Sequence, residues 1–284
     1  MPDQPIVDAH VHLWDPRRLN YRWLEDIEKL NRPYLLPDYD AASRALCIEK
    51  MVFVQCDCLP EQSLAEVQFV DELAEKDARI AGIVAHAPVE RGKRVREDLE
   101  KLTKHPRVKG VRRLLEGEAD AAFCLQPNFL AGLAELADFD LSFDVCIKSV
   151  QLAACIEMVK STPQVRFVLD HLGKPDIKTR PGTLWKTELQ TLAKLPNVAC
   201  KISGILTAAD RGNWQSEDLR PYVDHVLTCF GIERVMFGSD WPVVLLAGDL
   251  EKWADAVAEA VPTLTASEQR RLFRDNAIAT YKLC

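Results

Sequence analysis

Short apolar runs alternate with longer amphipathic stretches along the 284 residues of the chain. Each run is rich in Val, Ile and Phe and has the length of one buried β-strand. Near-continuous apolarity of this kind is typical of parallel strands that helices cover on both faces. The predicted strands are Ile6–His10, Lys50–Gln55, Ile80–Ala85, Val108–Leu114, Leu141–Ile147, Val165–Asp170, Val198–Ile202 and Val235–Gly238.

The segments between these strands carry helical periodicity, with apolar residues such as Leu64, Val67 and Leu73 on one stripe. The predicted helices are Glu61–Lys76, Gln151–Lys160, Asp218–Phe230 and Leu250–Val261. Eight strands alternating with helices predict an α/β fold, a single-domain (β/α)8 TIM-like barrel over residues 1–284; such a barrel needs about 250 residues. A doubly wound open sheet is the alternative.

Two segments depart from the strand–helix alternation. Leu13–Pro37 is too long for a simple loop between a strand and a helix, and loops of this length are usually functional or disordered. Its aromatic residues, including Trp14 and Trp23, favour a lid or a wall of a site over disorder. Thr179–Trp185 is a second candidate loop.

The composition excludes several classes of protein. A net charge of −7 argues against a nucleic-acid partner, which would require a basic face. The nine cysteines have no regular spacing, which favours reduced, mostly buried thiols. No apolar stretch has the length of an export signal or a membrane span. We therefore expect a soluble cytoplasmic protein with a small-molecule partner and no membrane or nucleic acid; the oligomeric state stays open.

Three motifs place polar residues where predicted strands end, which in a parallel barrel is the catalytic face. The first strand ends in His10 and His12, which alternation directs to the same side. Two neighbouring imidazoles suit a metal or a polarised oxygen. His171 follows the sixth strand, and Asp240 follows the eighth, where a carboxylate is placed to accept a proton from water. Any one of these residues alone is as consistent with a structural role.

A second group of candidates is cationic, polar or aromatic. Only one of Arg112 and its neighbour Arg113 can face the barrel lumen, and the sequence does not decide which. A lumenal cation is costly unless an anion, a polar substrate or Asp240 pairs with it; a structural ion pair is an equal alternative for Lys201. The predicted substrate-binding residues are Arg112, Gln55, Lys201, Trp14 and Trp241, whereas His86 is expected to be structural and His105 and His225 to lie at the surface.

These motifs together resemble the amidohydrolase superfamily, and within it the "amidohydrolase 2" lactonase branch. The segments that carry the resemblance are 8–15, 54–55, 109–112, 169–175, 201–204 and 237–242, so it extends over nearly the whole chain. The closest similarity is to sugar lactonases that act on L-fuconolactone or L-rhamnonolactone. The resemblance implies hydrolysis of a sugar lactone, with Asp240 as general base and His10, His12 and His171 stabilising the charge on the carbonyl oxygen.

The fifth predicted strand departs from the metal-dependent members of the superfamily, because Phe143–Lys148 contains no histidine. His10, His12 and Asp240 could still hold a zinc, which needs three protein ligands and a water. Lys201 and Arg112 would repel it, so we expect no obligatory cofactor and at most an optional zinc. The alternatives are a metal-dependent amidohydrolase or decarboxylase, and a sugar-acid binding protein without catalysis.

Overall fold

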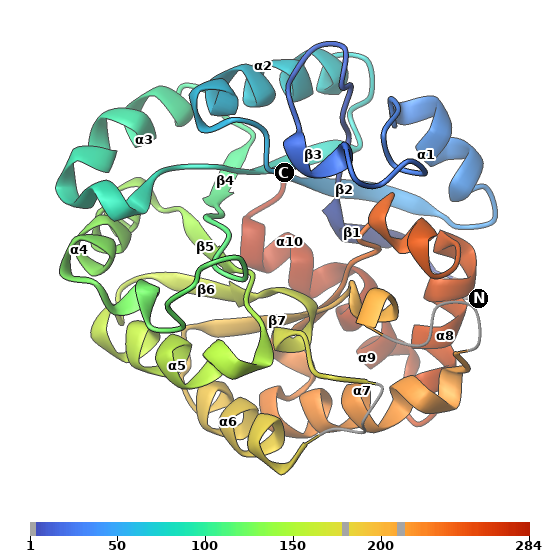
Figure 1. Cartoon of the computed structure of the whole chain (residues 1–284). Helices are drawn as coiled ribbons and strands as arrows, with labels where there is room; N and C mark the ends of the chain where they lie inside the picture. Colours follow the sequence, from blue (N-terminus) through green and yellow to red (C-terminus); the bar gives the residue numbers. More distant parts are fainter. Residues whose placement is uncertain (1–3, 178–181, 209–213) are drawn as a thin grey trace.

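The computed structural model describes residues 4–177, 182–208 and 214–284 and shows a ring of parallel strands surrounded by helices (Figure 1). The strands are β1 Ile6–Val11, β2 Ile48–Val54, β3 Ile80–Ala85, β4 Val108–Val111, β5 Ser142–Val145, β6 Arg166–Leu169, β7 Val198–Ile202 and β8 Val235–Phe237. Each strand pairs with the next in chain order. A parallel bridge between Val11 and Trp241 links the end of β8 back to β1. This order confirms the (β/α)8 barrel and excludes the doubly wound sheet.

Most of the helices pack around the outside of the strands, and the last one in the chain covers one end of the barrel (Figure 1). They are α1 Leu36–Ala42, α2 Ser63–Ala74, α3 Arg96–Leu102, α4 Pro127–Glu135, α5 Leu152–Ser161, α6 Thr183–Ala193, α7 Ser216–Phe230, α8 Leu250–Ala260, α9 Ala266–Arg270 and α10 Asn276–Tyr281. The four predicted helices correspond to α2, α5, α7 and α8. The candidate loop Thr179–Trp185 lies partly outside the described residues, and from Thr183 onward it is helix. None of the helices described is both long and apolar enough to span a membrane.

An apolar cluster fills the end of the barrel opposite the carboxyl ends of the strands, called the lower end below, and α10 covers this end. Small and branched side chains from the strands pack there with the end of the chain; they include Val7, Val52, Val84 and Met236. Tyr281 of α10 joins this cluster and is almost fully buried. Each fully buried aliphatic side chain contributes about 1.5–3 kcal/mol. This filling closes one end of the barrel, and the pocket described below opens at the other.

The long segment between β1 and α1 folds back against the barrel mouth. Its Trp14 donates from Nε1 to the carbonyl oxygens of Leu30 and Arg32, at 3.2 and 2.9 Å. The backbones of Trp14 and Tyr34 also form a bridge, which ties the two ends of the segment together. These bonds hold the segment as an ordered wall beside the carboxyl ends of the strands.

Candidate active site at the barrel mouth

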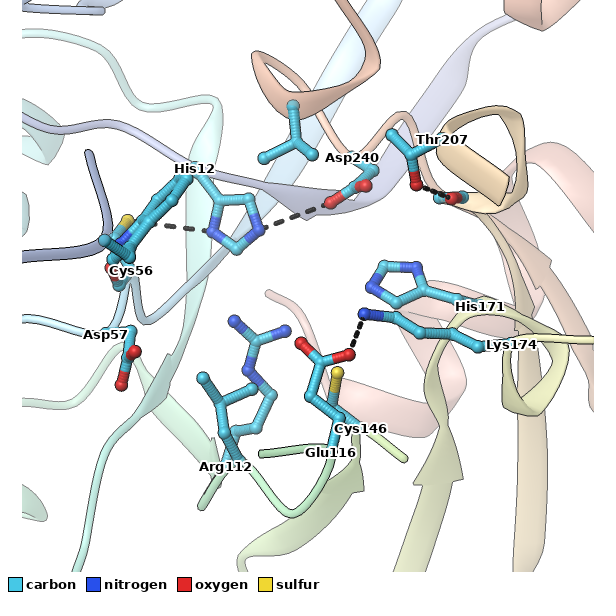
Figure 2. A pocket seen from close by; sticks show the side chains of 14 residues that line it. His12, Cys56, Asp57, Arg112, Glu116, Cys146, His171, Lys174, Thr207 and Asp240 are labelled. Atoms are coloured by element: carbon cyan, nitrogen blue, oxygen red, sulfur yellow. Dashed lines mark hydrogen bonds and ion pairs between the residues drawn. The ribbon is translucent and has the colours of Figure 1, made fainter. Parts of the chain in front are cut away.

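A pocket of about 240 Å³ opens at the carboxyl ends of the strands (Figure 2). Its walls mix carboxylates, cations, imidazoles and thiols with a few apolar side chains. The lining residues are His12, Trp23, Cys56, Asp57, Arg112, Leu114, Glu116, Cys146, His171, Lys174, Gly204, Thr207, Asp240 and Val243. The predicted residues His12, His171, Asp240 and Arg112 therefore come from different strand ends to one cavity, as in enzymes built on this barrel.

His10, His12 and Asp240 form a compact triangle. The Nε2 atoms of the two histidines are 3.2 Å apart, and Asp240 Oδ1 lies 3.6 Å from His10 Nε2 and 3.4 Å from His12 Nε2. Ligand atoms about 2.0–2.1 Å from a tetrahedral zinc lie roughly 3.3 Å from one another. The three atoms therefore have the spacing of a metal site, and the same three residues lie within ligand distance of one another.

Hydrogen bonds on the far side of each ring orient the two imidazoles. His12 Nδ1 donates to the carbonyl oxygen of Val54 at 2.7 Å, which leaves Nε2 with a free lone pair facing Asp240. His10 Nδ1 lies 3.3 Å from Asp170 Oδ1. Such partners fix the ring orientation and raise the basicity of the nitrogen that faces the site.

The backbone at His171 and Asp240 is in the left-handed region, with φ of 55° and 57°. Residues other than glycine rarely adopt this conformation, and it often marks functional sites. His171 Nδ1 shares a hydrogen bond of 2.8 Å with Ser203 Oγ. Gly204 packs directly against this ring, since a Cβ there would lie 2.2 Å from His171 Nδ1. The glycine is therefore required for the histidine to occupy its position.

Burial and charge set the protonation states of these groups. Burial alone would raise the pKa of Asp240, but the neighbouring His171, His12 and His10 lower it well below its usual value. Burial lowers the pKa of His171 to about 4 and also lowers that of His12, although Asp240 partly opposes it in both. At neutral pH the pocket thus combines an ionised carboxylate with neutral imidazoles.

Arg112 faces the lumen, which settles the choice that the sequence leaves open. Its Nη2 donates to the carbonyl oxygen of Gln55 at 2.6 Å, and its Nη1 lies 3.2 Å from Asp170 Oδ2 and 3.3 Å from His10 Nε2. Arg113 points away and pairs with Glu90 and Glu118. The Arg112 side chain is almost fully buried, yet it lines the pocket and so places a fixed positive charge at the edge of the His10–His12–Asp240 triangle.

Lys201 lies inside the barrel beneath the pocket, out of reach of a substrate. Its Nζ is 2.6 Å from Asp144 Oδ2 and 3.1 Å from Asp170 Oδ1, and all three side chains are 0% exposed. Tyr281 donates to the same Asp144 oxygen at 2.6 Å. Lys201 does not line the pocket, so the structure favours the ion-pair role. Because two carboxylates balance its charge, the expected repulsion of a metal by Lys201 is weaker than the sequence suggests.

Three other expected substrate-binding side chains also lie outside the pocket lining. Trp14 and Trp241 are buried in aromatic packing with Tyr34, and neither contributes to the pocket surface. Gln55 uses its Oε1 to accept from the backbone N–H of Asp57 at 2.6 Å. The indole on the pocket wall belongs instead to Trp23, which donates to the carbonyl oxygen of Cys56 at 2.8 Å. Strand-end position brings Trp14 and Trp241 close to the mouth, but core packing takes them away from it.

The remaining histidines lie outside this pocket. His86 is half-buried just past β3, and burial lowers its pKa to about 4. His105 pairs with Asp71, and His225 of α7 contacts the carbonyl oxygen of Lys186. None of the three lines the pocket, and the roles expected of them stay predictions.

Reasoning from strand ends missed the side chains that loops bring to the pocket. Asp57 follows β2, Glu116 follows β4, and Lys174 follows the turn after β6. Lys174 and Glu116 form an ion pair across the pocket wall, drawn as a dashed line in Figure 2. The Lys174 position was visible in the motif Gly173-Lys174-Pro175, but nothing in the sequence indicates its partner.

Residues 7–283 match the family model described as amidohydrolase. The chain belongs to the amidohydrolase family. A protein of Burkholderia multivorans named L-fucono-1,5-lactonase is 33% identical over 98% of this chain and 96% of that protein. A namesake from Burkholderia ambifaria is 27% identical over 98% and 95%. The crystal structure of a Burkholderia multivorans amidohydrolase with bound zinc is 32% identical, with a TM-score of 0.88 over 99% of this chain and 100% of that one.

These relatives confirm the resemblance that the motifs carry, and they support an enzyme of the amidohydrolase superfamily, of which a hydrolase is the class best supported. For this amidohydrolase, the triangle of His10, His12 and Asp240 is a potential metal site, and a metal is an option that the zinc-containing neighbour supports.

Proposed function

We propose that this amidohydrolase hydrolyses a sugar lactone, an aldonolactone such as L-fuconolactone or L-rhamnonolactone, to the open-chain sugar acid. The observation that carries the proposal is the convergence of Asp240, His12 and His171 on one small pocket, with Asp240 Oδ1 3.4 Å from His12 Nε2. The directions of their pKa shifts agree with a carboxylate base beside neutral imidazoles. Full-length similarity to proteins named L-fucono-1,5-lactonase supports the substrate class.

In the proposed reaction, Asp240 accepts a proton from a water that attacks the lactone carbonyl. Its lowered pKa keeps it ionised but also makes it a weak base, so stabilisation of the oxyanion must provide much of the rate enhancement. Arg112 is the fixed cation in the pocket closest to the triangle, and the imidazoles of His12 and His171 line the same cavity. The proton taken up by Asp240 then passes to the ring oxygen as the ester bond breaks.

A divalent metal held by His10, His12 and Asp240 would supply Lewis acidity and a more acidic water. We propose that the enzyme does not require it. The Arg112 Nη1 atom, 3.3 Å from His10 Nε2, already brings a positive charge to this corner. Asp170, 3.2 Å away, balances part of that charge, and the remainder disfavours a second cation by repulsion. The tetrahedral spacing of the triangle makes a metal-dependent hydrolase of the same family the second candidate.

The test is a pH-indicator screen of the purified protein against a panel of aldonolactones, because each turnover releases a proton. We expect turnover of uncharged five- and six-carbon sugar lactones by the wild type. We expect the Asp240→Asn variant to fold normally and to lose roughly 10²–10⁴-fold in kcat, as removal of a general base does. An Asp240→Asn variant with near wild-type turnover would contradict the assigned role. Binding of the lactones without any turnover by the wild type would favour a sugar-acid binding protein.

A further inference from the structure

Asp57 presents a carboxylate to the pocket without a partner for it. Its backbone N–H donates to Gln55 Oε1 at 2.6 Å and its φ is 57°, so the residue is held in the left-handed region. Over the described ranges 4–177, 182–208 and 214–284, its carboxylate makes no hydrogen bond or ion pair, and the residue is exposed within a wall of the pocket. Asp tolerates this conformation better than most residues, so the turn can hold Asp57 at the pocket wall at little cost.

The Glu116–Lys174 ion pair lies on another part of the pocket wall. Figure 2 shows Asp57 at the left of the view and Lys174 at the right, beside His171, with Glu116 below and between them. Glu116 and Lys174 are each about one-third exposed, at 31% and 29%, so solvent and ligand reach both. Besides the groups assigned to the chemistry, the pocket wall thus carries three charged groups that the proposed reaction does not use, Asp57, Glu116 and Lys174.

The chemistry of Asp57, Glu116 and Lys174 fits the hydroxyl groups of a neutral sugar ring. An ionised carboxylate only accepts hydrogen bonds, whereas an ammonium group only donates them, and a hydroxyl can satisfy either one. Three carboxylates and two cations line the pocket, Asp57, Glu116 and Asp240 with Arg112 and Lys174. This excess of negative charge disfavours a ligand that carries several carboxylates of its own.

We propose that Asp57 and the Glu116–Lys174 pair bind the hydroxyl groups of the lactone, and that Asp57 is the main residue that distinguishes hydroxylated lactones from plain ones. The proposal rests on the lactonase function proposed above. A site that hydrogen-bonds the hydroxyl groups of its substrate discriminates against an analogue that lacks them, and most strongly where the pairing groups are shielded from water. Among the described residues, the Asp57 carboxylate has no hydrogen-bond partner before the ligand binds. A hydroxylated ring would therefore add more hydrogen bonds at Asp57 than at the already paired Glu116 and Lys174.

The test compares two lactones with the same six-membered ring, an aldono-1,5-lactone and δ-valerolactone, which carries no hydroxyl groups. Asp57→Gly removes the carboxylate and accepts the positive φ without strain. Asp57→Asn keeps one accepting oxygen and also tolerates this conformation. Glu116→Gln removes the charge that pairs with Lys174. The matched control, Asp26→Asn, removes an exposed carboxylate of the β1–α1 segment that does not line the pocket.

We expect Asp57→Gly to lower kcat/KM for the aldonolactone roughly tenfold to a hundredfold, the effect of losing a hydrogen bond to a charged group. Asp57→Asn and Glu116→Gln should cause smaller losses in the same direction. All three variants should hydrolyse δ-valerolactone at the wild-type rate, and Asp26→Asn should match the wild type on both substrates. Circular dichroism and the midpoint of thermal unfolding verify that each variant is folded.

Two results would overturn the inference while leaving the proposed function intact: equal losses on both lactones, or no loss on either, in Asp57→Gly. The first would mean that Asp57 maintains the shape of the pocket, and the second that hydroxyl groups are bound elsewhere. A wild-type protein that hydrolyses no lactone would instead refute the lactonase function, and this inference with it.

Discussion

Replacing Lys201 by Met separates a structural role for this residue from a role in substrate binding. The substitution removes the cation that lies 2.6 Å from Asp144 and 3.1 Å from Asp170, deep inside the barrel. Breaking a buried ion pair by deleting one partner costs roughly 3–5 kcal/mol. Asp144 keeps its hydrogen bond from Tyr281, and Asp170 keeps Arg112, so we expect the lower end, about 3 kcal/mol.

Urea denaturation followed by circular dichroism measures this loss directly. In a thermal melt of a chain of this size, a loss of about 3 kcal/mol lowers the midpoint temperature of unfolding by roughly 6–12 °C. Burial raises the pKa of Asp144, while Lys201 opposes the increase, so loss of Lys201 should raise that pKa further. A carboxyl whose folded-state pKa is raised favours folding more as it becomes protonated, and the deficit should therefore shrink as the pH falls.

The controls are a surface lysine and a compensating substitution. Lys160→Met removes an exposed partner of Glu157 and should change the free energy of unfolding by no more than about 0.5 kcal/mol. Lys201→Met combined with Asp144→Asn should recover part of the loss, because one uncompensated charge is gone. The reasoning is refuted if Lys201→Met unfolds at the wild-type urea concentration while its KM for the lactone rises severalfold.

Three further predictions concern the mouth of the barrel. Gly204→Ala should leave a folded protein with kcat reduced at least tenfold, checked by lactone kinetics, because a Cβ there would meet His171 Nδ1 at 2.2 Å and force the ring to move. Alanine at His10, His12 or His171 should lower kcat more than it raises KM; effects on KM alone would show that these residues only bind substrate. Protein treated with a strong chelator should retain its lactonase activity, and added zinc should not raise it severalfold. Metal analysis in which about one zinc per chain tracks activity would instead favour the metal-dependent enzyme.

The sequence predicts the barrel well because each strand is buried on both faces and therefore leaves a short apolar signature. The same logic brings His12, His171 and Asp240 together, since residues after parallel strands converge on one end of a barrel. Trp14 shows that this reasoning predicts the position of a residue but not the direction of its side chain. Its position after β1 is correct, but the direction of a large side chain in a loop depends on packing partners, here Leu30, Arg32 and Tyr34, that no local pattern specifies.

The hydrophobic pattern also does not predict how far a lumenal side chain lies from the barrel mouth. The sequence leaves substrate binding and a structural ion pair open for Lys201, and only the three-dimensional register places it beneath the pocket beside Asp144 and Asp170. Contacts between residues of different loops are still harder to predict from the sequence. Glu116 and Lys174 are separated by 58 positions in sequence, and their pairing becomes evident only when both loops are built over the same mouth.

The bond between Tyr281 and Asp144 has a consequence for the order in which the protein can mature during synthesis. Tyr281 follows all eight strands in the chain, so the ribosome has made every part of the barrel wall before it makes this residue. Until then, Asp144 Oδ2 lacks the hydrogen bond from Tyr281 and keeps Lys201 as its one partner among the described residues. We therefore expect water to reach the lower end of the barrel in a nascent chain that has completed its strands. Docking of α10 would then be the late step that excludes water from the barrel interior.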